Sequence, residues 1–175
     1  MARRVVGEMT LAHYTSADLV VPQLHARTGS AVVGELCAVL ERHERLSNCL
    51  GLYNQVIAHE NLSPTIIIPG CALPHARIQG ESQLSFALGR SQERLDWFGA
   101  KGADVRLVFL FVVPESEAGL YLKVLSALAQ FGRDKERVQK LLDAPDGQTM
   151  FEILRASNFP KPVNKHEYSV SSTTL

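Results

Sequence analysis

The sequence predicts an α/β protein, a three-layer sandwich in which a mixed central sheet is flanked by helices on both faces. Three observations lead to this fold class. Apolar residues recur at helical spacing in the first and last thirds of the 175-residue chain, whereas the middle contains short apolar runs of strand-like composition. Residues 105–114 are apolar on both alternating faces, which is typical of a strand covered on both sides. Helices are therefore expected on both faces of the sheet.

Two helices are predicted in the first third of the chain. Residues 30–47 place apolar side chains at three- and four-residue spacing, at Val32, Val33, Leu36, Val39, Leu40 and Leu46. Residues 52–62 form a second helix whose inward side chains are expected to be Leu52, Val56 and Leu62. Pro64 ends this helix, because proline disfavours helical geometry in the residue before it.

The middle of the chain is predicted to form the sheet. Short, partly β-branched runs at residues 65–68 and 71–74 are separated by a Pro-Gly pair, and residues 84–89 alternate apolar with small or polar residues. The run at residues 105–114 is the longest of these, and it is expected to be the central strand.

The last third returns to helical spacing. Residues 116–131 form an amphipathic pattern, and Asp134 and Asp146 are expected to cap two shorter helices. After these helices the sequence loses its periodicity and gains proline, serine and threonine. We therefore expect one domain over residues 1–157 and a flexible C-terminal tail over residues 158–175.

Composition excludes several classes of function. Lys plus Arg and Asp plus Glu both number 18, so no broad basic face for nucleic acid is expected. Cys37, Cys49 and Cys71 are odd in number and lack C-x-x-C spacing, which favours free thiols over a disulfide framework. No signal peptide is recognised, and no apolar run is long enough for direct membrane insertion. The expected location is the cytoplasm.

The candidate site centres on one histidine. His75 follows Pro74 where a predicted strand gives way to a loop, and Arg77 lies two residues further on. The proline stiffens the approach to the imidazole, and a guanidinium matches the geometry of phosphoryl oxygens. This combination indicates a phosphate carried on histidine. The structural alternative is a loop histidine bonded to the backbone beside a surface arginine.

The stretch PTIIIPGCALPHARI, residues 64–78, resembles the active-site signature of enzyme IIA domains of the bacterial phosphotransferase system, in the fructose, mannitol and nitrogen-regulatory class. The matching signature positions are Thr65, Gly70, Ala72, Pro74, His75 and Ala76. By the order of its elements the resemblance extends over residues 10–157.

The resemblance implies a phosphoryl carrier without a cofactor. His75 would accept a phosphoryl group from an HPr-like phosphocarrier protein and pass it to a IIB domain, or its phosphorylation would signal to a regulatory target protein. Arg77 and Thr65 would support the phosphate. Neutral imidazole is a good nucleophile near neutral pH, which fits this chemistry.

Three departures from the family pattern qualify this expectation. His59 stands where the family has an arginine, and Tyr121 stands where it has a second histidine; either side chain can still donate a hydrogen bond to phosphate. Residues 66–69 replace a glycine-rich stretch and make the loop stiffer. The alternative is therefore a non-catalytic regulatory module that binds a partner through the His75 face. The sugar, the downstream partner, the choice between transport and regulation, and a homo-oligomer stay open.

Other groups of residues give weaker indications of a functional site. Cys71 and His75 have a spacing compatible with two metal ligands, and His59 could be a third, but no fourth ligand is evident and no metal site is predicted. Trp97 is expected to be a packing residue. The motifs of nucleotide-binding loops, dinucleotide-binding folds and serine hydrolases do not occur.

Overall fold

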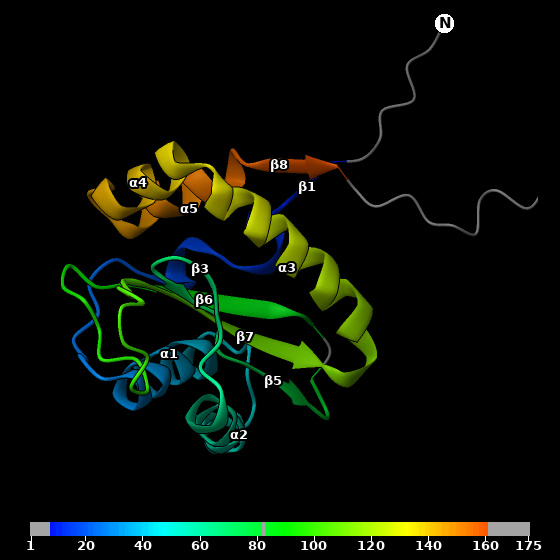
Figure 1. Cartoon of the computed structure of the whole chain (residues 1–175). Coiled ribbons are helices and arrows are strands. Elements are labelled where there is room, and N and C mark those ends of the chain that lie inside the picture. Colours follow the sequence, from blue (N-terminus) through cyan, green and yellow to red (C-terminus); the bar gives the residue numbers. More distant parts are fainter. Residues whose placement is uncertain (1–7, 82, 161–175) are drawn as a thin grey trace, which may run out of the picture.

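A mixed six-stranded sheet forms the middle of the molecule (Figure 1). The computed structural model describes residues 8–81 and 83–160. The strands are β2 (Val20–Val21), β6 (Ser85–Arg90), β7 (Leu107–Pro114), β4 (Cys71–Ala72) and β3 (Ile66–Ile68) in spatial order, with β5 (His75–Ile78) beside β7.

Strand β7 is the centre of this sheet. It runs antiparallel to β6 on one side, and on the other it pairs in parallel first with β4 and then with β5. All eight residues of β7 are buried. Alternate side chains of β7 point into two separate apolar clusters, one on each face of the sheet. The predicted three-layer sandwich and its central strand are thereby confirmed.

The first helical layer consists of α1 (Gly29–Arg42) and α2 (Cys49–Leu62), which lie together below the sheet in Figure 1. Helix α1 ends five residues earlier than predicted, and Glu44 adopts a left-handed φ of 58° shortly after it. The inward placement of Leu62 is wrong, because this last helical residue is 89% exposed.

The second layer contains α3 (Ala118–Arg133), α4 (Lys135–Asp143) and α5 (Gly147–Arg155), on the opposite face (Figure 1). Both predicted caps are confirmed. The Asp134 carboxylate accepts a hydrogen bond from the Arg137 amide at 3.1 Å, and the Asp146 carboxylate accepts one from the Thr149 amide at 2.7 Å. Such caps satisfy amides that the first turn of a helix leaves free.

Several short elements were not predicted. They are β1 (Glu8–Thr10) and β8 (Asn158–Pro160), with the 3-10 helices η1 (Leu11–Tyr14), η2 (Ala17–Leu19) and η3 (Glu115–Glu117). Strands β1 and β8 pair antiparallel as a separate two-stranded sheet. The first three residues of the predicted tail therefore form a strand, and the rest of that tail lies outside the described residues.

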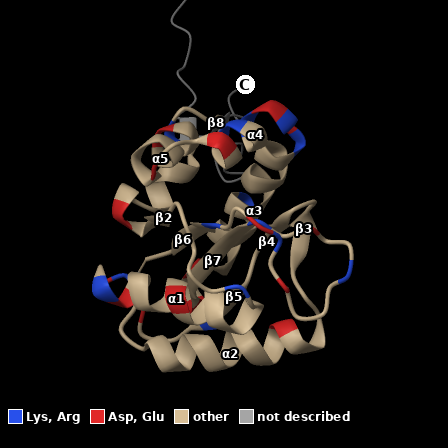
Figure 2. Cartoon of the chain, turned by 90° about the vertical axis from the view of Figure 1, so that its left-hand side faces the viewer, with Lys and Arg blue, Asp and Glu red and all other residues tan. Residues whose placement is uncertain are grey.

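Basic and acidic residues are interspersed along the ribbon in Figure 2, in line with their equal numbers. Within residues 8–81 and 83–160, no helix combines the length and the apolar character that crossing a membrane requires. Cys37, Cys49 and Cys71 are all free thiols.

Two glycines of α3 give a matched test of the packing between α3 and β3. A Cβ added at Gly132 would approach the Ile68 side chain to 2.4 Å, whereas a Cβ at Gly119 would meet nothing within 4 Å. We expect Gly132→Ala to destabilise the protein by about 1–3 kcal/mol, because overpacking outweighs the gain in helix propensity. Gly119→Ala should leave stability unchanged or raise it by up to about 1 kcal/mol. Urea denaturation of both variants measures the difference, and equal stabilities would contradict the close contact.

Candidate active site

His75 follows the end of β4 closely but is itself the first residue of β5, so the prediction that the chain enters a loop at His75 is wrong. It pairs with Phe111 of β7, and the Pro74 carbonyl accepts a hydrogen bond from the Phe111 amide at 3.0 Å. Pro74 has no backbone N–H to donate to a neighbouring strand, and β5 is only four residues long. The sequence pattern therefore did not predict this strand. The pairing fixes the backbone of His75 to the rigid centre of the sheet.

The imidazole of His75 is partly exposed, and one of its nitrogens is committed to the backbone. Nδ1 lies 3.0 Å from the Leu73 carbonyl oxygen. A carbonyl only accepts hydrogen bonds, so Nδ1 carries the hydrogen in the neutral ring. The lone pair of Nε2 is then the nucleophilic position.

Two aromatic rings from different layers flank the imidazole. The centroid of the His59 ring from α2 lies 5.4 Å from that of His75, and the centroid of Tyr121 from α3 lies 5.1 Å from it. Tyr121 also packs edge-on against Phe111 at 5.5 Å. The structure thus brings together three of the predicted site residues where the two helical layers meet beside β5.

The Tyr121 side chain stays a hydrogen-bond donor over the physiological pH range. Burial, with a further contribution from the charge of Glu60, raises the pKa of Tyr121 to about 12. In the part of the chain that the structure describes, only Thr15 Oγ1 and Ser85 Oγ are buried without a partner. The Tyr121 hydroxyl is not among them and has no hydrogen-bond partner among the described residues, so it reaches solvent next to His75.

Among the described residues, neither Arg77 nor Thr65 forms a hydrogen bond with the His75 ring. Arg77 is exposed on β5 and, being two residues beyond His75, projects from the same face of the strand. It has no hydrogen bond or ion pair with any described residue. The Thr65 hydroxyl donates to Glu60 Oε1 at 2.6 Å, so its hydrogen is already in use.

Glu60 is a residue that sequence reasoning did not place in the site. Its fully buried carboxylate accepts hydrogen bonds from the Thr65 amide at 2.9 Å, the Thr65 hydroxyl, and the indole Nε1 of Trp97 at 3.0 Å. His59 Nδ1 lies 3.8 Å from the same carboxylate. Glu60 follows Leu52 and Val56 at intervals of four, which puts it on the inner stripe of α2, and this spacing was the available signal.

Glu60 is connected to His75 through the backbone. Thr65, which Glu60 holds at both its amide and its hydroxyl, accepts a hydrogen bond from the Leu73 amide at 2.8 Å. The Leu73 carbonyl in turn accepts from His75 Nδ1. A continuous chain of hydrogen bonds therefore runs from the buried carboxylate to the imidazole.

The surroundings of the ring contain no assembled metal site. Among the described residues, no group of three or more His, Cys, Asp and Glu side chains could hold a metal ion. Cys71 lies buried in β4, and that burial raises the pKa of its thiol to about 12. The site offers an imidazole nucleophile with donors beside it, an arrangement suited to group transfer.

Comparison with known sequences gives a family that covers most of the chain. The family model described as phosphoenolpyruvate-dependent sugar phosphotransferase system, EIIA 2, matches residues 13–157. The nitrogen regulatory protein of Bradyrhizobium diazoefficiens is 24% identical over 150 residues, which span 83% of this chain and 95% of that protein.

Solved structures agree with this relationship. Nitrogen regulatory protein IIA-Ntr from Neisseria meningitidis superimposes with a TM-score of 0.74 at 26% identity, covering 82% of this chain and 98% of that one. The mannitol enzyme IIA of Escherichia coli, in its complex with phosphorylated enzyme IIB, shares the fold with a TM-score of 0.65 at 14% identity, over 80% of this chain and 96% of that one. The chain therefore belongs to the EIIA 2 family of the phosphoenolpyruvate-dependent sugar phosphotransferase system.

Proposed function

We propose that this protein is a cytoplasmic phosphoryl carrier that is phosphorylated on Nε2 of His75. A bond forms between Nε2 and phosphorus as the bond from phosphorus to the donor's histidine nitrogen breaks. The donor is an HPr-like phosphocarrier protein. The group then passes to a IIB-like domain, or the phosphorylated state itself signals to a regulatory target. The single observation that carries this proposal is the partly exposed imidazole whose Nδ1 is held by Leu73, while Nε2 has no hydrogen-bond partner among the described residues.

The neighbours of His75 supply what phosphoryl transfer requires. Such transfer depends on in-line placement and on stabilising the negative charge of the equatorial oxygens. The Tyr121 hydroxyl offers a hydrogen bond at any pH below its raised pKa, and His59 offers a second donor. Arg77 offers a permanent positive charge on the same face of β5. Thr65 acts through its backbone, because its hydroxyl serves Glu60.

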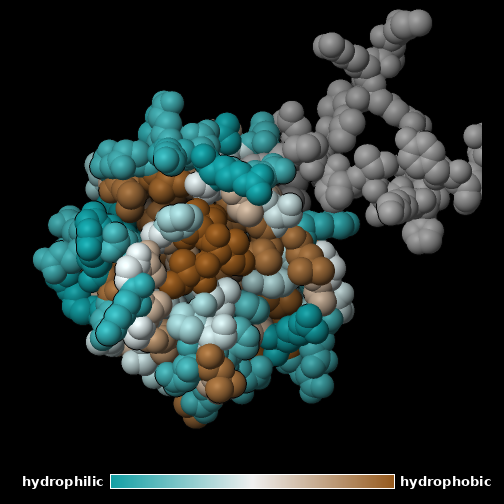
Figure 3. Space-filling view, viewed as in Figure 1, coloured by the Kyte–Doolittle hydropathy of each residue, from teal (hydrophilic) through white to brown (hydrophobic). Residues whose placement is uncertain are grey.

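An exposed apolar surface near these residues fits the docking of a partner protein. Ile67 and Leu122 are 45% and 64% exposed, and they lie in β3 close to Thr65 and in α3 next to Tyr121. Figure 3 shows an apolar area on this side of the molecule, in the region where β3 runs in Figure 1. Exposed apolar patches of this kind mark protein interaction sites. A partner that delivers or receives phosphate must cover such a surface for the two reacting groups to meet.

Phosphorylation of the purified chain tests the proposal. The protein is incubated with radiolabelled phosphoenolpyruvate, enzyme I and HPr, and the phosphate bound to the chain is measured. We expect up to one acid-labile, alkali-stable phosphoryl group per chain, the stability typical of phosphohistidine. A chain that takes up no label would favour the regulatory module that only binds a partner through the His75 face.

Removing the Tyr121 hydroxyl should slow the transfer without abolishing it. A hydrogen bond to a charged group contributes about 1.5–3 kcal/mol, so Tyr121→Phe should lower the phosphorylation rate by roughly tenfold or more. Tyr53→Phe, which removes a tyrosine hydroxyl from a different helix, α2, is the control.

A comparison of the wild type with Tyr121→Phe also gives a prediction for the pH dependence of the phosphorylation rate. The raised pKa keeps Tyr121 protonated well above neutral pH. The ratio of wild-type to Tyr121→Phe rates should therefore stay constant between about pH 6 and pH 9. A ratio that falls steeply within this range would show that another group, and not the tyrosine hydroxyl, makes the contact.

A further inference from the structure

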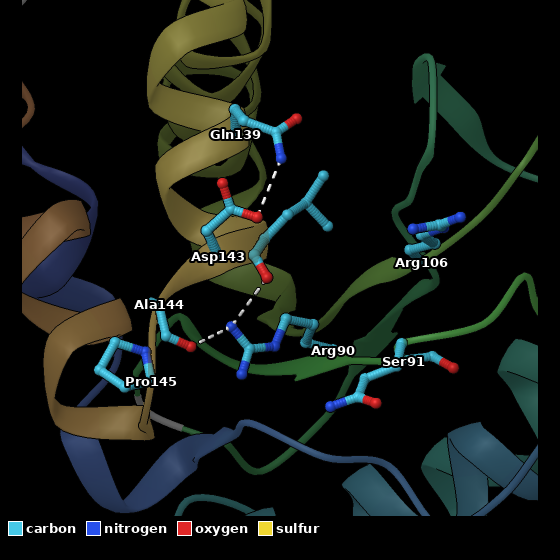
Figure 4. A pocket seen from close by; sticks show the side chains of 9 residues that line it. Arg90, Ser91, Arg106, Gln139, Asp143, Ala144 and Pro145 are labelled. Atoms are coloured by element: carbon cyan, nitrogen blue, oxygen red, sulfur yellow. Dashed lines mark hydrogen bonds between the residues drawn. The ribbon is translucent and has the colours of Figure 1, made fainter.

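A pocket of about 450 Å³ lies away from His75, near the start of the central strand. Arg90 of β6 pairs with Leu107 at the start of β7, whereas His75 pairs with Phe111. Four residues of extended strand separate the two levels, which corresponds to about 13 Å. Arg90, Ser91, Gln92 and Arg106 line one side of the pocket, and residues 139 and 142–145 at the end of α4 line the other (Figure 4).

The buried side chain of Arg90 forms the inner wall. Its Nε donates to the Pro22 carbonyl at 2.9 Å, and its Nη1 donates to the carbonyls of Leu141, Leu142 and Ala144 at 3.0, 3.2 and 2.6 Å. These bonds hold the guanidinium in one orientation. They leave Nη2 unused, since this nitrogen has no hydrogen-bond partner among the described residues. Nη2 is also not one of the buried atoms that lack a partner. Nη2 is therefore accessible to solvent, in a residue that lines the pocket.

All the partners of Arg90 are neutral. The side chain is 7% exposed, and no carboxylate lies within ion-pair distance of it in the described part of the chain. Burial lowers the pKa of Arg90, although a guanidinium remains charged at neutral pH. A buried charge normally has an opposite charge beside it, and carbonyl dipoles replace such a partner only in part. The pocket thus contains a fixed positive charge that has no ion-pair partner among the described residues, although the negative charge of Asp143 is near enough to raise the pKa of Arg90 and partly offset the effect of burial.

A second arginine, Arg106, lines the same pocket. Arg106 is exposed and has no hydrogen bond or ion pair from its side chain to any described residue. Its backbone is fixed on both sides, because its amide donates to the Gly70 carbonyl at 2.9 Å and its carbonyl accepts from the Ser91 amide at 2.8 Å. A capping role at the end of α4 explains Arg90, but it gives no reason for Arg106 to stand unpaired beside it.

Polar groups complete the lining. Gln139 donates to the Asp143 carboxylate at 3.0 Å, and Gln92 and Ser91 add an amide and a hydroxyl. Two guanidinium groups against one carboxylate leave a net positive charge. Planar guanidinium donors match phosphate and carboxylate oxygens, and the volume lies in the range of small-molecule sites.

We propose that this pocket binds a small anionic metabolite through a phosphate or carboxylate group held between Arg90 and Arg106. The Gln92 and Ser91 side chains then contact the neutral part of the ligand. This site is separate from the His75 site, so its occupation does not depend on phosphoryl transfer.

Titration of the full chain with simple anions tests the proposal. Sodium phosphate and sodium acetate are added in separate arms to ¹⁵N-labelled protein, with sodium chloride at the same ionic strength as the reference. We expect saturable shifts of the Ser91, Gln92 and Arg106 amide signals, with a dissociation constant on the order of 1 mM for the better anion. The arm that binds more tightly identifies the group. Shifts that are absent, or that chloride reproduces, would overturn the proposal.

Two variants in the pocket have opposite expected effects on binding, and two variants elsewhere serve as controls. Arg106→Gln should weaken binding about tenfold, because it removes one charge-assisted contact, while Arg42→Gln on α1 should not change it. Asp143→Asn should strengthen binding roughly threefold, because it removes the repelling carboxylate and keeps the acceptor for Gln139. His75→Ala should bind as the wild type does. Equal affinities for wild type, Arg106→Gln and Asp143→Asn would overturn the assignment.

Discussion

Replacing His75 with alanine is expected to abolish phosphorylation of the chain while its fold persists. The alanine variant lacks the proposed acceptor nitrogen, so labelling should fall by at least about a thousandfold. The imidazole is partly exposed, and its loss removes a single hydrogen bond to Leu73. The free energy of unfolding should therefore drop by no more than about 1 kcal/mol. Acid-labile label and urea denaturation measure the two effects.

Two control variants make the result specific. His43→Ala removes an exposed histidine after α1 and should label like the wild type. His59→Ala removes the imidazole next to the proposed acceptor, and it should slow the labelling but not end it. If His75→Ala still took up label and His59→Ala did not, the acceptor would be His59 and the proposed chemistry would move to α2.

The fold could be predicted from the sequence to the extent that local patterns determined it. The apolar run of β7 and the capped helices α4 and α5 carry their signals within a few residues, and each is confirmed. The end of α1 and the exposure of Leu62 depend on how the helices meet other elements, which a periodic pattern does not contain.

The candidate site, like the fold, could be predicted from the sequence only in part. The neighbourhood of His59, Tyr121 and His75 was expected from the resemblance, and the ring distances agree with it. Strand β5 was missed, because pairing with β7 is a contact between residues more than thirty positions apart. Glu60 was missed as well, since a carboxylate in a helical pattern gives no sign that an indole and a threonine will surround it.

Truncating Glu60 is expected to cause the largest loss of stability among the variants considered. Glu60→Ala leaves the Thr65 amide, the Thr65 hydroxyl and the Trp97 indole without their acceptor, and it opens a cavity in a fully buried position. The expected cost is about 3–5 kcal/mol. Glu93→Ala, which breaks the exposed ion pair with Arg27, should cost less than about 1 kcal/mol.

Glu60→Gln separates the hydrogen bonds of this residue from its charge. Its amide oxygen can accept from the Thr65 amide and the Trp97 indole, while its NH2 group donates to the Thr65 hydroxyl oxygen, so most of the stability should return. The charge does not return. Because that charge helps to raise the pKa of Tyr121, the pKa in Glu60→Gln should fall below the wild-type value of about 12.

Two measurements decide whether Glu60 positions the imidazole. Ultraviolet titration follows the Tyr121 pKa, and ¹⁵N shifts of the imidazole nitrogens report whether Nδ1 still carries the hydrogen. Glu60→Gln should keep the wild-type tautomer of His75, because the bonds from Thr65 to Leu73 to His75 survive. Glu60→Ala should lose the wild-type tautomer of His75, and it should be phosphorylated more slowly even under conditions in which it is folded. The hydrogen bonds that begin at Glu60 can affect phosphoryl transfer only through the orientation of the His75 ring. If folded Glu60→Ala kept the wild-type tautomer of His75, the role of the Glu60 carboxylate would therefore be structural only.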